Sequence, residues 1–316
     1  MRIEYHRTML ADHVRNLAFH DALKKVIVPG KSVVVDIGCG TGLLGFMAAR
    51  LGAKRVFLLE TAEIAALAKK LAKANGIRNV EVVAAHSTEV EPPERADIVI
   101  SETLGNYAFE ENIVETLGDA RDRYLQPGGV MIPGKVQQFV VPVVSAKLFK
   151  DLVTWDGVAQ RLDLDLTFEL ARTMGLNNIY VRWLEASDLL DGGKNAVQWD
   201  AVDFSKATKT TRAGGGEWVI TEDQTITGLA IWWRAELVPG VELGTGPFDP
   251  RTHWEQLYLP TLAPLTVKAG DTVFARLRST TSYANGTNVT WTLGIRDARG
   301  KERDVQSLDL NKGFLP

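Results

Sequence analysis

The sequence predicts an α/β protein in which a doubly wound parallel sheet is followed by an antiparallel β-domain. Three observations lead to this prediction. Short apolar segments alternate with helix-like segments as far as Tyr124, and most segments beyond Gly134 read as strands separated by turns. The 316 residues also suffice for two domains at ~100–200 residues each. We therefore expect one domain over residues 1–133 and a second over residues 134–316.

The first domain shows the alternation of strands and helices that is typical of βαβ units. Residues 1–30 have helical spacing that ends at Pro29-Gly30, and the first strand follows at Val33-Val34-Val35. Because the connections are short, we expect mainly parallel strands with right-handed crossovers. The further predicted strands are 55–60, 80–84 and 96–100, and the further predicted helices are 43–51, 62–75 and 111–124, the last ending near Pro127-Gly128-Gly129.

The second domain reads as an antiparallel barrel or sandwich, because strand-like segments and glycine-containing turns recur along it. Residues 155–192 differ, since they carry a helix-like and mixed pattern, and we expect them to project from this domain as an insertion. The predicted strands are 138–144, 196–204, 216–221, 227–237, 265–268, 271–279 and 288–296.

Composition excludes several classes of protein. Lys and Arg together number 36 and Asp and Glu 39, so the net charge of −3 argues against a general nucleic-acid binder. Cys39 is the one cysteine, which excludes a disulfide within the chain and disfavours a cysteine-based zinc site. We find neither a signal-peptide pattern nor an apolar run of the ~18 residues that a membrane span needs, and we expect a cytoplasmic protein.

A glycine-rich turn between the first strand and the next helix is typical of a nucleotide-binding loop. It contains Asp36, Gly38, Gly40 and Gly42, and glycines there let the backbone approach a ligand closely. Glu60 ends the next strand, where a carboxylate can accept hydrogen bonds from both hydroxyls of a ribose. Position, spacing and the acid together predict a nucleotide-like cofactor.

The loop by itself leaves two cofactors open. Gly40, Gly42 and Gly45 satisfy the G-x-G-x-x-G pattern of dinucleotide folds, so the loop permits NAD, whereas a phosphate loop of the G-x-x-x-x-G-K-S/T type is absent. The full D-x-G-x-G-x-G run resembles that of S-adenosylmethionine-dependent methyltransferases. That resemblance implies that the run, with Thr41, lies under the methionine-adenosine portion of the cofactor and that Glu60 holds the ribose.

Two carboxylates flank a short loop after the strand 96–100. Glu102 follows the strand directly, at the edge where open α/β sheets bind their ligands, and Glu111 begins the next predicted helix. Both carboxylates can therefore turn into one pocket. Glu110 is better explained as an acid that the dipole of this helix favours at its N-terminus.

A third segment, Thr252-His253-Trp254, lies in the second domain. A lone His-Trp pair indicates packing more often than chemistry. In combination, however, the glycine loop, the S-E-x-L-G-x-x-x-x-x-E loop and the T-H-W loop occur in an order that resembles the protein arginine methyltransferases, in particular a bacterial-like member with a shortened N-terminus. The resemblance extends over nearly the whole chain.

This resemblance implies a Rossmann-like class I methyltransferase domain, followed by an antiparallel β-barrel domain that carries a helical dimerisation arm at about 155–192. In the family this arm packs on the cofactor domain of a second subunit, which implies a homodimer. It implies S-adenosylmethionine as the cofactor and a guanidino nitrogen of arginine as the methyl acceptor. We expect neither a metal nor a nucleic-acid or membrane partner.

The resemblance also assigns roles to individual residues. Glu102 and Glu111 form a substrate clamp, and His253 orients it or disperses the departing proton, with Asp12 as a partner. Arg15 binds the carboxylate of the cofactor, and Met9 lies near the transferred methyl group. The candidate catalytic residues are Glu102, Glu111 and His253, and the candidate cofactor-binding residues are Met9, Arg15, Asp36, Gly38, Gly40, Thr41, Gly42, Glu60, Ser87, Thr88 and Glu102.

Physical chemistry explains why a guanidinium needs two acids. Its pKa exceeds ~12 and its lone pairs are delocalised, so it is a poor nucleophile. Two carboxylates can hold it through fork-like, charge-assisted hydrogen bonds, which draw positive charge toward the bound nitrogens and leave one nitrogen richer in electrons. The same contacts aim that nitrogen at the methyl group, so positioning and preorganised charge supply much of the rate gain.

Two features depart from the family pattern. An aromatic Y-F-x-x-Y segment usually precedes the first helix and covers the cofactor, whereas this chain starts at Met1-Arg2-Ile3-Glu4-Tyr5, and we expect Tyr5 or His6 to take part of its place. Family members commonly carry an acid that receives the adenine amino group where this chain has Thr88. Adenine recognition here should therefore use backbone groups or Ser87.

Alternatives for the function stay open at the level of sequence. The acceptor is arginine in proteins, or else free arginine or another small guanidine. A non-catalytic scaffold conflicts with the presence of all five residues Asp36, Glu60, Glu102, Glu111 and His253, and a nicotinamide oxidoreductase gains no support from the two later loops. Met9 with His253 resembles members that make asymmetric dimethylarginine, although Ile113 occupies a position where many of these carry methionine.

Overall fold

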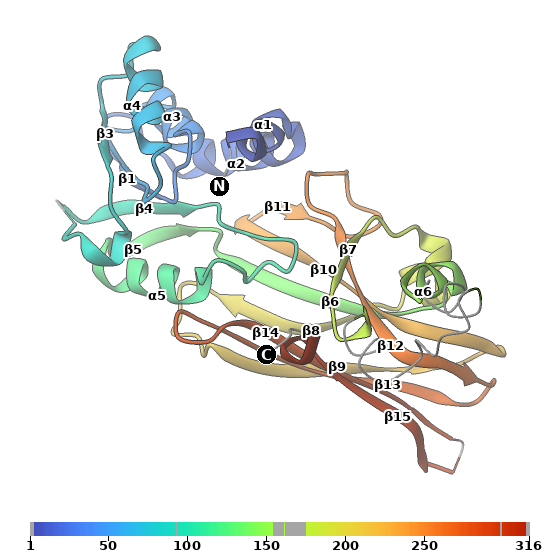
Figure 1. Ribbon diagram of the computed structural model, residues 1–316. Coiled ribbons are helices and arrows are strands. Elements are labelled where there is room, and N and C mark those ends of the chain that lie inside the picture. Colours follow the sequence, from blue (N-terminus) through green and yellow to red (C-terminus); the bar gives the residue numbers. More distant parts are fainter. Residues whose placement is uncertain (1–2, 93, 154–160, 162–174, 298, 314–316) are drawn as a thin grey trace.

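The computed structural model describes residues 3–92, 94–153, 161, 175–297 and 299–313. Half of the expected insertion at 155–192, namely residues 155–160 and 162–174, lies outside these residues. The chain passes from a first half, which ends with a strand at Ile132, to a second half, which begins with a strand at Lys135. In Figure 1 the first half lies at the upper left and the strands of the second half extend toward the lower right.

The first half is a parallel five-stranded sheet with the strand order β3-β2-β1-β4-β5, which confirms the predicted α/β class. The central strand β1 (Val33–Ile37) is buried at all five positions, as expected for a strand between two neighbours under covering helices. Of the helices described, none is long and apolar enough to cross a membrane. The other elements are β2 (Arg55–Leu59), β3 (Val80–Val83), β4 (Ala96–Ser101), β5 (Leu125–Ile132), α3 (Leu43–Arg50), α4 (Ala65–Ala74), η1 (Ser87–Glu89) and α5 (Ile113–Arg123).

The predicted end of the helix near Tyr124 agrees with α5, which ends at Arg123, but the strand β5 that follows was not predicted, and Pro127-Gly128-Gly129 lies inside it. Partners of β5 on β4 shift from Leu125 opposite Ala96 to Val130 opposite Ile98. Four residues of β5 therefore bulge out between these pairs, and Gly128 has a φ of 79° there. Turn-forming residues can thus occupy a strand, because the bulge needs the backbone conformations that they adopt.

The N-terminal helical region is two helices, α1 (Ile3–Ala11) and α2 (His13–Val26), and not a continuous one. Asp12 separates them in an extended conformation, and its side chain accepts a hydrogen bond from the backbone N–H of Arg15 at 2.9 Å. This is an N-cap, which satisfies one of the free amides at the start of α2. The break turns Asp12 toward the inside of the protein, where it is buried.

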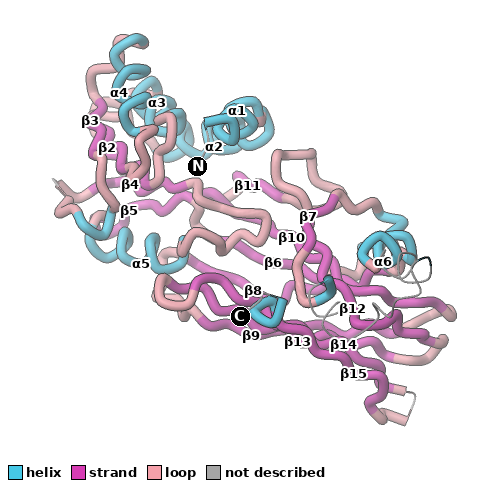
Figure 2. Tube along the Cα trace, in the orientation of Figure 1, coloured by secondary structure: helices cyan, strands magenta, loops and turns pink. Residues whose placement is uncertain are grey.

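The second half consists of two antiparallel sheets (Figure 2). One has the order β7-β12-β10-β6-β8 with β11 on β10, and the other has the order β15-β14-β13-β9. No ladder joins the two sheets in the part of the chain that the structure describes, so the expected barrel is not closed. The elements are β6 (Lys135–Val143), α6 (Ala146–Leu152), β7 (Tyr180–Arg182), η2 (Ala186–Asp188), η3 (Leu190–Gly193), β8 (Val197–Asp203), β9 (Thr211–Val219), β10 (Gln224–Val238), β11 (Val241–Gly244), β12 (Gln256–Val267), β13 (Thr272–Ser282), β14 (Gly286–Arg296), β15 (Glu302–Asp309) and η4 (Leu310–Gly313).

The two sheets share one core. The indole of Trp291 on β14 donates to the carbonyl of Pro260 on β12 at 2.8 Å, and Trp291 is fully buried. Strands β8 and β9 approach so closely that a Cβ on Gly214 would lie 1.9 Å from the carbonyl oxygen of Trp199. Only a glycine fits at this position, so the close approach of β8 and β9 depends on Gly214.

Candidate active site

The carboxyl ends of β1, β2 and β4 border a cavity of about 280 Å³, which is where open α/β sheets bind their ligands. Helices α1 and α2 contribute to the same cavity. Most of the residues that the sequence singled out line it: Met9, Arg15, Asp36, Gly38, Gly40, Thr41, Glu60, Ser87, Glu102 and Glu111. Three do not: Gly42, Thr88 and His253.

The glycine loop needs its glycines for conformation. Gly38, Gly40 and Gly42 all have positive φ, at 68°, 52° and 86°. A Cβ on Gly38 would lie 2.8 Å from Cγ2 of Thr103, in the loop after β4. Gly42 has a different place, because it is the left-handed N-cap of α3 and a Cβ there would meet the ring of Phe46 at 2.7 Å. Gly42 therefore forms the turn before α3 and does not line the cavity.

Two carboxylates hold this loop from within the first half. Asp36 is fully buried and accepts a hydrogen bond from the amide of Gly45 at 2.9 Å, while burial raises the pKa of Asp36 to about 7. Glu60 accepts from the amide of Gly40 at 2.9 Å and, through its other oxygen, from that of Ala62 at 2.8 Å. The loop is therefore positioned by the strands that carry it.

His6 of α1, which was expected with Tyr5 to help cover the cofactor, lies against the glycine loop. A Cβ on Gly40 would lie 3.1 Å from Cε1 of His6, and His6 lines the cavity. Burial lowers the pKa of His6, although the nearby Glu60 carboxylate opposes this shift. The side chain of Tyr5 lies outside the described residues.

Glu102 is nearly buried and binds a guanidinium that belongs to the protein itself. Nε of Arg15 donates to Oε2 of Glu102 at 2.7 Å, and a second guanidinium nitrogen donates to the same oxygen. Oε1 accepts from the amide of Leu104 at 3.2 Å. The side chains of Arg15 and Glu102 are only 8% and 3% exposed, so this is a desolvated, charge-assisted pair. We predicted that Arg15 binds the cofactor; Arg15 lines the cavity, and within the protein its guanidinium pairs with Glu102.

Glu111 lines the same cavity as Glu102, but the helix after it starts later than predicted. α5 begins at Ile113, while Glu111 and Asn112 have left-handed φ values of 52° and 57°. Such a conformation is strained for residues with a side chain, and it recurs at functional sites. Burial raises the pKa of Glu111, and the negative charges of Glu102 and Glu110 raise it further. The negative charges of Glu102 and Glu111 therefore repel each other across the cavity that both line.

Glu110 stabilises the loop between Glu102 and Glu111 from within. The prediction that it is the N-terminal acid of the next helix was wrong, because α5 begins only at Ile113. The carboxylate of Glu110 accepts from the amide of Tyr107 at 3.1 Å. A Cβ on Gly105 would lie 1.9 Å from Oε2 of Glu110, so the side chain folds over this glycine. Burial raises the pKa of Glu110, and it does not line the cavity.

His253 acts on the site through Asp12. Nδ1 of His253 lies 2.7 Å from Oδ2 of Asp12, and the backbone amide of His253 donates to the same oxygen at 2.8 Å. The imidazole packs on the ring of Trp254 with centroids 4.0 Å apart. Burial alone would raise the pKa of Asp12, but the hydrogen bonds from Arg15 and His253 lower it. Asp12 thus joins the second half to the helix that carries Arg15.

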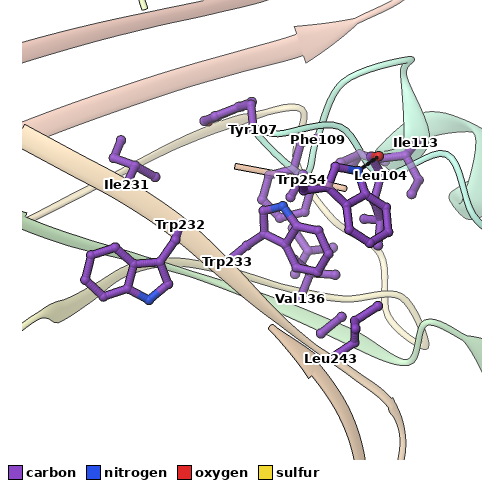
Figure 3. Packing of buried hydrophobic residues seen from close by; sticks show 14 of the residues in the cluster. Leu104, Tyr107, Phe109, Ile113, Val136, Ile231, Trp232, Trp233, Leu243 and Trp254 are labelled. Carbon is purple, nitrogen blue, oxygen red and sulfur yellow. Dashed lines mark hydrogen bonds between the residues drawn. The ribbon is translucent and has the colours of Figure 1, made fainter. Parts of the chain in front are cut away.

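The loop between the two acids is held by indoles of the second half (Figure 3). Nε1 of Trp254 donates to the carbonyl of Leu104 at 2.8 Å, and Nε1 of Trp233 on β10 donates to the carbonyl of Gly105 at 3.0 Å. The two indoles meet edge to face with centroids 5.0 Å apart. The sequence analysis did not identify Trp233 as part of the site. It lies in an apolar strand, and no nearby residue indicates that its indole binds a loop more than a hundred residues away.

Thr88 does not reach the cavity. It is exposed, and its hydroxyl lies 2.7 Å from Nδ1 of His86. His86 and Ser87 line the cavity instead, and the hydroxyl of Ser87 is buried without a hydrogen-bond partner in the part of the chain described. The expectation for Ser87 therefore agrees with its position, and that for Thr88 does not.

Family models identify both halves of the chain. Residues 18–138 match the model of the ribosomal protein L11 methyltransferase, and residues 136–294 match that of the arginine methyltransferase oligomerization subdomain. The chain belongs to the arginine methyltransferase family. The family predicted from the three loops is thereby confirmed, and the chain is an S-adenosylmethionine-dependent arginine methyltransferase.

Individual arginine methyltransferases match along most of their length. Protein arginine N-methyltransferase 1 of Schizosaccharomyces pombe is 28% identical over 323 residues, which cover 98% of this chain and 87% of that protein. The probable protein arginine N-methyltransferase 6.1 of Oryza sativa subsp. indica is 27% identical, with coverages of 90% and 83%. The fold matches a structure of the Trypanosoma brucei PRMT1 enzyme-prozyme heterotetrameric complex with AdoHcy, with a TM-score of 0.81, 23% identity and 98% coverage of both chains.

The residues of the cavity fit S-adenosylmethionine. The left-handed glycine loop exposes backbone at the end of β1, and Glu60 at the end of β2 offers carboxylate oxygens that a ribose can share. The buried hydroxyl of Ser87 lacks a partner among the described residues, and a base with ring nitrogens and an amino group can supply one. Arg15 offers a guanidinium for a carboxylate at the opposite end of the cavity.

Proposed function

We propose that this methyltransferase transfers methyl groups to guanidino nitrogens of arginine side chains in proteins, with Glu102 and Glu111 as the substrate clamp. The observation that carries the proposal is the ion pair of Glu102 with the guanidinium of Arg15, in a cavity that Glu111 also lines. In this pair a buried carboxylate accepts two charge-assisted hydrogen bonds from one guanidinium, which supports the proposal. A substrate arginine presents the same group.

The cofactor contributes one step and the protein contributes the geometry. When bound, S-adenosylmethionine supplies a methyl group on a sulfonium that a nitrogen can displace in line. We assign the glycine loop, Thr41, Glu60 and Ser87 to holding it, and Met9 to the wall near the methyl group. Arg15, already at Glu102, is placed to bind the carboxylate of its amino-acid portion.

The two acids act by charge and direction. Carboxylates at Glu102 and Glu111 draw the positive charge of the guanidinium toward the nitrogens that they bind, which leaves the remaining nitrogen a better nucleophile. The left-handed backbone at Glu111 fixes where its side chain leaves the loop. Because the loop is held by indoles of the second half, the direction of both carboxylates depends on that half.

His253 is a positioning residue in this proposal, since it does not line the cavity. Its hydrogen bonds fix Asp12, and Asp12 caps the helix from which Arg15 reaches Glu102. The same imidazole is a route by which the departing proton can leave the buried site.

We further propose a cytoplasmic homodimer with a domain boundary between residues 133 and 134. The match of residues 136–294 to an oligomerization subdomain supports the assembly, and the segment 155–192 is our candidate for the arm that contacts the second subunit. Light scattering of the purified chain tests the dimer. A monomer at micromolar concentration that still methylates its substrate contradicts it.

The substrate proposal is tested with radiolabelled S-adenosylmethionine and two acceptors, an Arg-Gly-rich peptide and free arginine. A Lys-Gly-rich peptide of equal charge is the matched control. We expect label in the arginine peptide alone, and mass spectrometry of the product gives the number and symmetry of methyl groups. Preferential labelling of free arginine contradicts the protein substrate and favours a small-molecule pathway.

A further inference from the structure

A tyrosine of the second half reaches the wall of the cofactor cavity. Tyr283 lies in the turn between β13 and β14, and its phenol oxygen lies 2.6 Å from the hydroxyl of Thr116 on α5 and 3.1 Å from Nε2 of His86. The His86 and Tyr283 rings also meet edge to face, with centroids 5.8 Å apart. The turn is tied down by its backbone, because the amide of Tyr283 donates to Glu115 at 2.6 Å.

Both partners of this phenol line the cavity, and they come from separate elements of the first half. His86 lies between β3 and η1, and Thr116 lies in the first turns of α5. Tyr283 itself does not line the cavity. Its hydroxyl therefore joins two pieces of the wall from behind.

One backbone amide fixes the direction of these hydrogen bonds. The N–H of Thr88 donates to Nδ1 of His86 at 3.3 Å, which makes this nitrogen an acceptor and leaves Nε2 as the donor of the ring. Nε2–H then donates to the oxygen of Tyr283, whose own O–H donates to Thr116. A tyrosine hydroxyl can accept and donate at once, whereas phenylalanine can do neither.

The position of this wall identifies the part of the cofactor that it faces. Glu102 follows β4, Glu60 follows β2, and His86 and Ser87 follow β3, at the outer edge of the sheet order β3-β2-β1-β4-β5. With the ribose at Glu60, the group beyond it is the base. The buried, unpartnered hydroxyl of Ser87 lies in the same wall, next to His86.

We propose that Tyr283 is a positioning residue for the adenine end of the cofactor site, so that a turn of the second half completes the cofactor pocket of the first. This inference rests on S-adenosylmethionine as the cofactor. The phenol sets the ring of His86 and the start of α5 at a fixed separation, and the base binds between them and Ser87. Cofactor affinity therefore depends on contact between the two halves.

Calorimetric titration with S-adenosylhomocysteine and with adenosine tests the proposal on the full-length chain. Tyr283→Phe keeps the ring and removes both hydrogen bonds, and we expect both ligands to bind about fivefold more weakly. Tyr180→Phe, on β7 away from the cavity, is the matched control and should bind both ligands within twofold of the unchanged protein. In steady state Tyr283→Phe should raise KM for S-adenosylmethionine while kcat and KM for the peptide stay unchanged.

A double-variant cycle shows whether the effect passes through Thr116. Thr116→Val removes one of the two partners of the phenol, and the double variant with Tyr283→Phe should bind no more weakly than Tyr283→Phe alone. If Tyr283→Phe does not fold, as judged by its thermal transition, Thr116→Val gives the same measurement from the other side. Binding of S-adenosylhomocysteine within twofold by Tyr283→Phe or its substitute overturns the inference. Failure of the unchanged protein to bind S-adenosylhomocysteine overturns instead the cofactor assignment.

Discussion

The glycine loop and the loop between the two acids border the same cavity but are held in different ways. Amides of the glycine loop donate to Glu60 and to the carbonyl of Leu59, and Asp36 holds the start of the helix that follows; all of these belong to the first half. The loop from Glu102 to Glu111 depends on Trp233 and Trp254 of the second half. The comparison teaches that the glycine loop is positioned by the first half alone, while the substrate clamp is assembled from both halves.

The clamp itself should show the largest effect. Glu111→Gln keeps the size of the side chain but removes the charge that polarises a guanidinium, and we expect kcat to fall by about 10²–10³-fold. The affinity for S-adenosylhomocysteine should stay within twofold, as measured by calorimetry, because Glu111 belongs to the loop held by the second half. Unchanged methyl transfer to the peptide would show that Glu111 is not part of the clamp.

Next in size is the pH dependence that Asp36 gives to the locally held loop. Its pKa of about 7 in the folded protein exceeds the ~3.9 of an unfolded chain, so the folded state binds the extra proton and stability falls as pH rises from about 4 to 7. The resulting change in the free energy of unfolding is at most about 4 kcal/mol. In urea titrations, Asp36→Asn should flatten this fall, whereas the exposed control Asp21→Asn should not. An equal pH slope in Asp36→Asn and the unchanged protein contradicts the argument.

Gly38→Ala should cost about 2 kcal/mol of unfolding free energy, because it puts a Cβ at a φ of 68° and 2.8 Å from Thr103. Affinity for S-adenosylhomocysteine should fall with it, since the loop must shift. Gly118→Ala is the control, because a Cβ on this helical glycine meets nothing within 4 Å. A Gly38 variant as stable as the Gly118 variant would mean that the loop is pliable.

Trp254→Phe should have the smallest effect, and it sharpens the comparison most directly. It removes the hydrogen bond to Leu104 while keeping an aromatic ring, so we expect kcat to fall about tenfold with cofactor affinity unchanged. Equal losses in turnover and in affinity for S-adenosylhomocysteine would show that the second half supports both loops alike.

The same contrast explains which features could be predicted from the sequence. The parallel sheet, the glycine loop and the two acids follow local rules of spacing and strand ends, and they were predicted. The break at Asp12 was not, because helical periodicity continues across it and the signal for the break is a cap whose second partner, His253, lies in the other half. β15 was missed because half of its residues are exposed and only Leu308 is buried, so the apolar alternation that marks a strand is absent.

Within the site, errors arose where the conformation of a short loop decides which neighbour a side chain contacts. Glu110 was assigned to a helix that starts three residues later, and its real partner is the loop at Gly105. Thr88 was placed by analogy of position, whereas the turn at η1 directs it to His86 and away from the cavity. Neither loop conformation follows from a residue propensity that can be read from a single sequence.

Asp12 couples the position of Arg15 to the position of the second half. Its carboxylate forms hydrogen bonds with the imidazole and the backbone amide of His253. The same carboxylate caps α2, the helix that carries Arg15 and so places it at Glu102. A rotation of one half against the other must therefore move that arginine along with it. A chimera that borrows residues 134–316 from a relative will keep its acids aligned only if the borrowed segment returns a histidine to the same carboxylate.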